Sequence, residues 1–187
     1  MSRVGVLALQ GDVREHIEAL DAIGVETLQV KTPDQLETVD ALIIPGGEST
    51  TIGKMAVRFG LLEPMRSVID AGLPVYGTCA GMILLAAAVT DGDQPLLASL
   101  DVVVRRNAFG RQNESFEADL EVEGLDNPFH AVFIRAPWIE KVGSEVEVLA
   151  SIDGHPVMVR QDEILATSFH PELTGDDRVH RMLVGMI

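Results

Sequence analysis

The stretch LPVYGTCAGMILLAAAV, residues 73–89, predicts a buried strand that turns abruptly into a helix of small and apolar residues. Pro74 to Tyr76 suit the end of a strand, and the run from Met82 to Ala88 suits a buried helix. Cys79, the one cysteine of the chain, falls at the turn between them. A strand followed at once by a helix is the repeating unit of a parallel sheet covered by helices.

The segments before this turn alternate in the same way. Strands are expected at 4–9, 27–30 and 41–44. A helix over about 12–23 would carry Val13, Ile17 and Leu20 on one face, with Asp12 suited to the N-cap. The alternation predicts an α/β fold with a mostly parallel central sheet flanked by helices.

Short β-rich runs dominate the chain after Leu100. They lie at 102–105, 115–122, 131–134, 146–152, 157–160 and 164–168, and we expect them to extend or flank the first sheet as additional antiparallel strands. A helical segment at 178–186 closes the chain. There is no internal repeat and no second core, so residues 1–187 are expected to form a single domain.

Composition excludes several classes of protein. The formal net charge of −15 would repel a phosphate backbone and an anionic membrane surface, so neither nucleic acid nor a membrane is expected as a partner. A single cysteine rules out an internal disulfide, a paired-thiol redox motif and a cysteine-rich zinc site. The first apolar run is too short for a signal peptide, and these features together predict a cytoplasmic protein.

The glycines around Cys79 favour a chemical role for it. Gly77-Thr78-Cys79-Ala80-Gly81 resembles the turn that exposes a nucleophilic serine between strand and helix, with sulfur in place of oxygen. The start of a helix favours negative charge, which would stabilise a thiolate. The alternative is an inert core cysteine, which is the more common situation for a lone cysteine and is disfavoured here only by these glycines.

The tripeptide His170-Pro171-Glu172 offers the partners that a cysteine nucleophile needs. In an extended segment, residues two apart point to the same side, so His170 and Glu172 would enter one site as a base and the carboxylate that orients it. Taken alone, this tripeptide is more typical of a solvated loop.

The glycine pair in PGGEST, residues 45–50, follows the expected strand at 41–44. Its backbone N–H groups could bind a developing oxyanion. The segment is also compatible with a plain turn in which Ser49 or Thr50 caps the next helix. No Gly-Lys-Ser/Thr follows, so it is not a phosphate loop.

These motifs resemble one family over nearly the whole chain. GTCAGM at 77–82 and SFHPE at 168–172 resemble the class I, triad-type glutamine amidotransferases. Their combination with LALQGDVREH (7–16), IPGGEST (44–50), RRNAFGRQNESFEA (105–118) and FIRAPWI (133–139) is similar to the glutaminase subunits of two-component pyridoxal 5′-phosphate synthases. The resemblance implies a flavodoxin-like three-layer fold, hydrolysis of L-glutamine to glutamate, and delivery of ammonia to a barrel-shaped synthase subunit in a hetero-oligomer.

The same resemblance assigns roles to individual residues. It implies a catalytic triad of Cys79, His170 and Glu172, and oxyanion donors at Gly47 and Ala80. Glutamine would be bound by the set Gly46, Gly47, Glu48, Arg106, Ile134 and Arg135, and Gln10 would face the partner subunit. No cofactor and no metal are implied, and His16, His155 and His180 are not expected to bind one. His130 receives no role.

One further hypothesis and two alternatives remain. Because Gly46 and Gly47 are flexible, a peptide there could rearrange when a partner docks and so complete the oxyanion hole. The chain could instead serve another synthase, although RNAFGRQ and FIRAP argue against that. A non-enzymatic protein with one oxidisable cysteine would need neither PGGEST nor His170-Pro171-Glu172.

Overall fold

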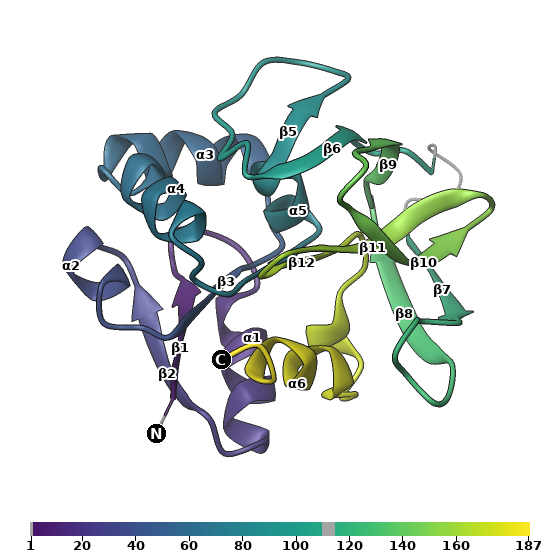
Figure 1. The fold of residues 1–187 in the computed structure, drawn as a ribbon, viewed down its shortest axis with the longest axis horizontal. Helices are drawn as coiled ribbons and strands as arrows, with labels where there is room; N and C mark the ends of the chain where they lie inside the picture. Colours follow the sequence, from purple (N-terminus) through teal and green to yellow (C-terminus); the bar gives the residue numbers. More distant parts are fainter. Residues whose placement is uncertain (1, 110–114) are drawn as a thin grey trace.

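A three-layer α/β arrangement organises the chain, in a computed structural model that describes residues 2–109 and 115–187 (Figure 1). The central sheet has seven strands in the order β10-β11-β12-β4-β3-β1-β2. Its parallel part consists of β1 (Arg3–Leu7), β2 (Glu26–Val30), β3 (Ala41–Ile44), β4 (Val75–Thr78) and β12 (Ile164–Thr167). The order 2-1-3-4-12 is that of a flavodoxin-like doubly wound sheet, so the predicted fold class is confirmed.

Helices cover both faces of this sheet. The helices α1 (Val13–Ala22) and α6 (Arg178–Val184) lie below it in the view of Figure 1, and α3 (Ser49–Arg58), α4 (Leu62–Asp70) and α5 (Ala80–Leu85) lie above. The short α2 (Pro33–Leu36) packs beside β2 and α4. Each face therefore buries its own apolar cluster against the sheet.

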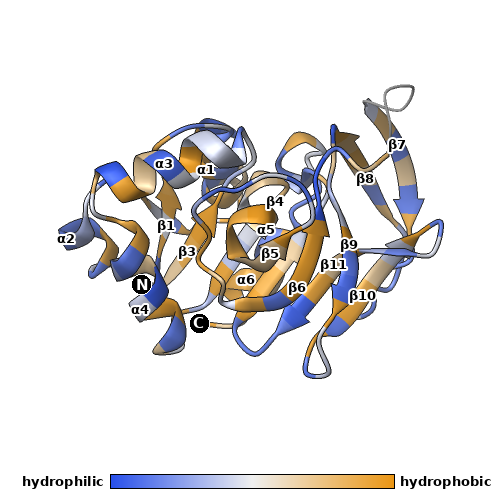
Figure 2. Cartoon of the chain, turned by 90° about the horizontal axis from the view of Figure 1, so that it is seen from above, coloured by the Kyte–Doolittle hydropathy of each residue, from blue (hydrophilic) through white to orange (hydrophobic). Residues whose placement is uncertain are grey.

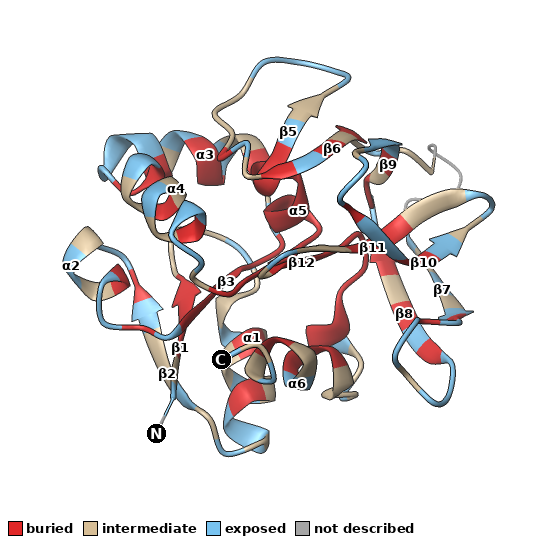
Figure 3. Ribbon diagram, viewed as in Figure 1, coloured by how far each residue is buried: buried red, intermediate tan, exposed pale blue. Residues whose placement is uncertain are grey.

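The two clusters account for most of the buried surface. The central strands and α5 are buried almost throughout, whereas α3 and α4 turn polar faces to solvent (Figures 2 and 3). Leu20 of α1 is fully buried, and Val13 and Ile17 pack against the same cluster. The helical stripe predicted for this segment is thus the face that meets the sheet.

The second half of the chain adds antiparallel strands, as predicted. The central sheet is extended by β10 (Glu147–Ile152) and β11 (His155–Gln161), while β7 (Ser115–Leu120) and β8 (Phe129–Ile134) form a separate hairpin. A third small sheet contains β5 (Ala86–Val89), β6 (Leu100–Arg105) and β9 (Trp138–Val142).

The prediction of a helix reaching Ala88 was wrong, and β9 was not predicted. The helix α5 ends at Leu85, because the amides of Leu97 and Ser99 bind the carbonyls of Leu84 and Leu85 at 2.7 and 3.0 Å. Residues Ala86–Val89 then pair with β6. Tertiary hydrogen bonds here outweigh the helix propensity of an alanine run.

Across the described residues, no helix is long and apolar enough to cross a membrane.

Candidate active site

The turn at Cys79 is strained and tightly packed. Cys79 has a φ of 48° and a ψ of −99°, and its amide donates to the carbonyl of Thr167 on β12 at 2.7 Å. A Cβ on Gly77 would lie 2.7 Å from the carbonyl carbon of Gly81, and one on Gly81 would collide with the carbonyl oxygen of Ile44. Both glycines are therefore required for α5 to pack on β3 and β4, as expected of a turn that presents a nucleophile.

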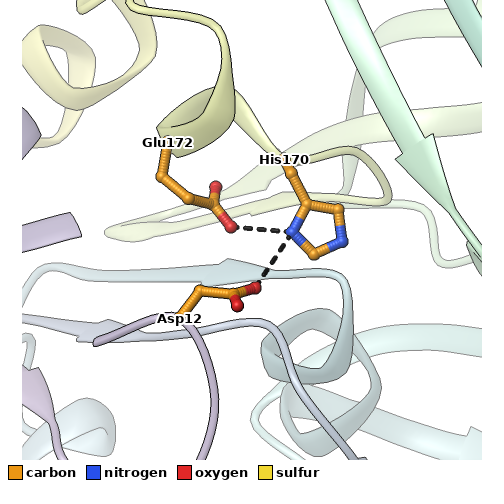
Figure 4. A group of neighbouring side chains, drawn as sticks. All are labelled: Asp12, His170 and Glu172. Atoms are coloured by element: carbon orange, nitrogen blue, oxygen red, sulfur yellow. Dashed lines mark hydrogen bonds and ion pairs between the residues drawn. The ribbon is translucent and has the colours of Figure 1, made fainter. Parts of the chain in front are cut away.

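His170 and Glu172 meet as predicted, although the backbone is not the extended segment that was expected. Glu172 lies in a short 3-10 helix, Pro171–Leu173, because Pro171 fixes a φ that suits its first position. The Nδ1 of His170 points at the Glu172 carboxylate and lies 2.7 Å from its Oε1 (Figure 4). The opposite ring nitrogen, Nε2, points away from the carboxylates.

Asp12 joins this pair, which the sequence did not suggest. The expected N-cap bond is absent from its side chain, and its Oδ2 instead lies 3.4 Å from Nδ1 of His170. Atoms of Asp12, His170 and Glu172 lie close enough together to ligate a cation. Because both carboxylates face the same ring nitrogen, we interpret the group as one N–H shared between two acceptors.

Electrostatics keep a proton on the His170–Glu172 pair. Burial lowers the pKa of His170, but hydrogen bonds with Asp12, Cys79 and Glu172 outweigh burial and raise the pKa to about 12. Burial also raises the pKa of Glu172, despite the opposing hydrogen bond and charge of His170. The raised pKa of His170 favours a protonated imidazole at neutral pH.

A pocket opens beside Cys79 and gathers most of the predicted substrate residues. The thiol Sγ lies 4.0 Å from the carbonyl oxygen of Ile134. Cys79, Asn107 and Arg135 all have positive φ, so strained backbone concentrates at this pocket. The lining consists of Gly47, Glu48, Ser49, Cys79, Ile83, Arg106, Asn107, Ile134 and Arg135.

Two ionic side chains of opposite sign face each other in this pocket. Arg106 Nη2 lies 3.2 Å from Oε1 of Glu48, and Nη1 reaches Oγ1 of Thr50 at 3.3 Å. Glu48 is also the N-cap of α3, since its side chain accepts from the amide of Thr50 at 3.3 Å. The alternative in which Ser49 or Thr50 caps this helix was therefore wrong. Charges of both signs suit the ends of an amino acid.

The glycine pair before α3 is packed against the triad. A Cβ on Gly46 would lie 2.5 Å from Cε1 of His170, and one on Gly47, whose φ is 150°, would lie 2.5 Å from Oε1 of Gln10. Gln10 Oε1 accepts the amide of Glu48 at 2.8 Å, so its side chain faces the glycine loop. Ala80 begins α5, where the first amides lack partners within the helix.

The remaining histidines fall into two groups. His16 and His180 are fully buried behind Glu172, and position 16 lies on the same helical face as Val13 and Leu20, a spacing that could have predicted its burial. His130 is exposed on β8 between Glu117 and Asp119, and His155 stacks on Trp138 with ring centroids 3.6 Å apart. Residues 110–112 of the RNAFGRQ motif (106–112) lie outside the described residues.

Fold and site together define a class, the doubly wound α/β proteins in which a cysteine on a strand-to-helix turn faces a histidine–carboxylate pair; the triad-type glutamine amidotransferases are of this class. Within it, the chain belongs to the SNO glutamine amidotransferase family, whose model matches residues 6–187.

Relatives and solved structures agree with this family. The chain is 60% identical to a protein of Frankia alni called "Pyridoxal 5′-phosphate synthase subunit PdxT", covering 99% of this chain and 94% of the relative. A protein of the same name from Streptomyces coelicolor is 58% identical, with 98% and 93% covered. A crystal structure described as a glutamine amidotransferase superposes with a TM-score of 0.94 at 54% identity, over 98% of this chain and 97% of that one.

Proposed function

We propose that this chain is the glutaminase component of a pyridoxal 5′-phosphate synthase. It hydrolyses L-glutamine to L-glutamate and ammonia, and the ammonia passes to a synthase subunit in a hetero-oligomer that makes the vitamin B6 cofactor. The observation that carries the chemistry is that Cys79 lines a pocket with the ionic pair of Glu48 and Arg106 and is hydrogen-bonded to His170, which itself pairs with Glu172. The names of relatives about 60% identical over nearly the whole chain support the choice of synthase.

Glutamine binding follows from the charges in the pocket. Arg106 pairs with the α-carboxylate of the substrate, and Glu48, released from Arg106, attracts its α-ammonium group. The backbone at Ile134 and Arg135 binds the same end of the molecule. Gly46 allows the loop to lie directly against the His170 ring, because any Cβ at this position would press on the ring.

The reaction uses the groups of the triad in turn. The Cys79 thiolate attacks the carboxamide carbon, and the amides of Gly47 and Ala80 bind the oxyanion. The C–N bond breaks as protonated His170 gives its proton to the leaving ammonia. A water molecule then attacks the thioester and gives a proton to His170, and the C–S bond breaks to release glutamate. Glu172 holds the imidazole in the working tautomer. No cofactor takes part.

Partner docking can control this site through the glycine loop. The amide of Glu48 is bound to Gln10 and is therefore turned away from an oxyanion. Rotation of a peptide at Gly46 to Glu48, caused by a subunit that contacts Gln10 and the loop after it, would supply a further donor. Equal turnover with and without the synthase subunit would contradict this part of the proposal.

The test is ammonia release from glutamine, measured with and without the synthase subunit. Cys79→Ala should abolish release and labelling by a glutamine-analogue alkylator, whereas the exposed control His130→Gln should retain both. Residual turnover in Cys79→Ala, or labelling of another residue, would contradict the assignment. Stable association with a different synthase in a pull-down would show that the proposed partner is wrong. Residues 1–187 act together as one glutaminase domain.

A further inference from the structure

A second polar layer lies behind the triad, and the mechanism above does not use it. His16 of α1, Thr78 of β4 and His180 of α6 are all fully buried. Nδ1 of His16 lies 3.0 Å from Nε2 of His180, and Nε2 of His16 lies 3.3 Å from Oγ1 of Thr78 and 3.6 Å from Oε2 of Glu172. Fully buried polar side chains are costly unless they are paired, so this layer requires an explanation.

Glu172 has one carboxylate oxygen that faces this buried layer. Its Oε1 is bound to His170, but its Oε2 has no hydrogen-bond partner among the described residues and is buried. Nε2 of His16, which can donate, lies 3.6 Å from this oxygen. This distance is longer than a hydrogen bond, as catalytic contacts often are before substrate binds. An N–H on Nε2 of His16 directed at Oε2 of Glu172 would stabilise this buried carboxylate oxygen.

The direction of the N–H groups follows from which atoms are left unpaired. In the described part of the chain, Nδ1 of His180 is buried without a partner. If that nitrogen carried the hydrogen, a donor would be stranded in the core, and Nε2 of His16 would present a lone pair to the Glu172 carboxylate. If Nε2 of His180 carries it, that hydrogen binds Nδ1 of His16, and Nε2–H of His16 points at Thr78 and Glu172. The second arrangement leaves no imidazole N–H stranded in the core, because Nε2–H of His16 has the oxygens of Thr78 and Glu172 as acceptors.

Both imidazoles are neutral, which this arrangement needs. Burial, together with repulsion by the protonated forms of His180 and His170, holds the pKa of His16 well below its ordinary value. Burial lowers the pKa of His180 to about 4, against the opposing charge of Asp177. The other ionisable groups that face Glu172 are His170, Asp12 and Tyr76.

We propose that His16 is a positioning residue for the reaction. The Nε2–H of His16 holds Oε2 of Glu172, and the hydrogen bond from His180 fixes the tautomer of His16. Glu172 then keeps its other oxygen on His170, and the ring keeps Nε2 toward the substrate. The inference rests on the proposed glutaminase function for its kinetic consequence, but the hydrogen-bond arrangement itself does not depend on it.

Two amide substitutions separate positioning from simple packing. The side-chain nitrogen of glutamine can occupy the place of Nε2, whereas asparagine reaches only the place of Nδ1. In the complex with its synthase subunit, His16→Asn should lower kcat about tenfold, the order expected when a buried carboxylate loses a donor, with KM within about twofold of the wild type. The acidic limb of the pH profile should move up by roughly half a unit or more, because Glu172 then binds a proton more easily. His16→Gln should restore both, and His130→Gln is the control on an exposed histidine.

The outcomes are distinct. Equal loss of kcat in His16→Asn and His16→Gln with an unmoved pH profile would mean a structural role and would overturn the inference, as would full activity in His16→Asn. If His16→Asn does not fold, nitrogen-15 NMR of labelled histidines in the wild-type chain decides: both His16 and His180 should carry hydrogen on Nε2 only. A hydrogen on Nδ1 of His16 would refute the arrangement. Absence of glutamine hydrolysis by the wild-type complex would refute the proposed function and leave the NMR result standing.

Discussion

Gly46→Ala should disable the site while leaving the fold in place. The new Cβ would lie 2.5 Å from Cε1 and 3.0 Å from Nδ1 of His170, and 2.8 Å from Oδ2 of Asp12. Carbon atoms pack best at about 3.5–4.0 Å, so the ring has to retreat by about 1 Å. A displacement of this size at a reacting group costs roughly a hundredfold in rate. We therefore expect kcat to fall about a hundredfold.

The cost in stability should be much smaller than the cost in rate. Overpacking of a buried position destabilises a protein by about 1–3 kcal/mol, and in a chain of this length each kcal/mol lowers Tm by about 2–4 °C. Glutamate formation in the complex and Tm are to be measured on the same preparation. Gly185→Ala is the matched control, because the nearest atoms to its Cβ are 3.4 Å away and its φ of −69° is ordinary for alanine.

The result that would refute this reasoning is a folded Gly46→Ala protein with kcat within about threefold of the wild type. In that case the His170 ring would not need its observed position for catalysis. A loss of activity matched by Gly185→Ala would also count against it, since that substitution contacts nothing in the pocket.

Three other substitutions test separate parts of the structure. Gly81→Ala places a Cβ on the Ile44 carbonyl oxygen, so both backbones must move; Tm should fall by roughly 6–12 °C, for about 3 kcal/mol. The pKa of His180 is lowered to about 4, so its contribution to the free energy of unfolding is present above about pH 6.5 and is lost as pH falls through 4. Denaturant titrations of the wild type should show a loss of up to about 3 kcal/mol over this range, and His180→Gln should lack this loss. Arg106→Lys, which cannot form the two-pronged contact, should raise KM for glutamine about tenfold with kcat little changed, and a change confined to kcat would contradict its assignment to substrate binding.

The sequence predicted the fold and the pairing of His170 with Glu172 because both are signalled locally. Strand and helix patterns alternate along the first half of the chain, and Gly77 and Gly81 mark the nucleophile turn by their spacing alone. His170 and Glu172 were paired correctly although the backbone between them is a 3-10 turn and not a strand. Two residues apart, these side chains meet in either geometry.

What the sequence could not predict depends on contacts between distant segments. Asp12 is an ordinary N-cap residue by its local sequence, and only the folding of the segment 168–173 over α1 brings His170 within 3.4 Å of it. Similarly, His16 and His180 are 164 positions apart. The substrate-binding roles proposed for residues near Cys79 were expected only from a family resemblance, since no spacing relates Glu48 to Arg106 or to Ile134.

The hydrogen bond from the Cys79 amide to the Thr167 carbonyl extends the ladder between β4 and β12, in which Thr78 pairs with Thr167. This amide therefore sits at the end of two interior strands and can exchange with deuterium only when that ladder opens. The amide of Glu48, held by the side chain of Gln10 alone, has no such protection. Mass spectrometry in deuterated water should find slow exchange at Cys79 and fast exchange at Glu48. Cys79 would then lie on a ladder that opens slowly, next to the faster-moving loop that contains Glu48.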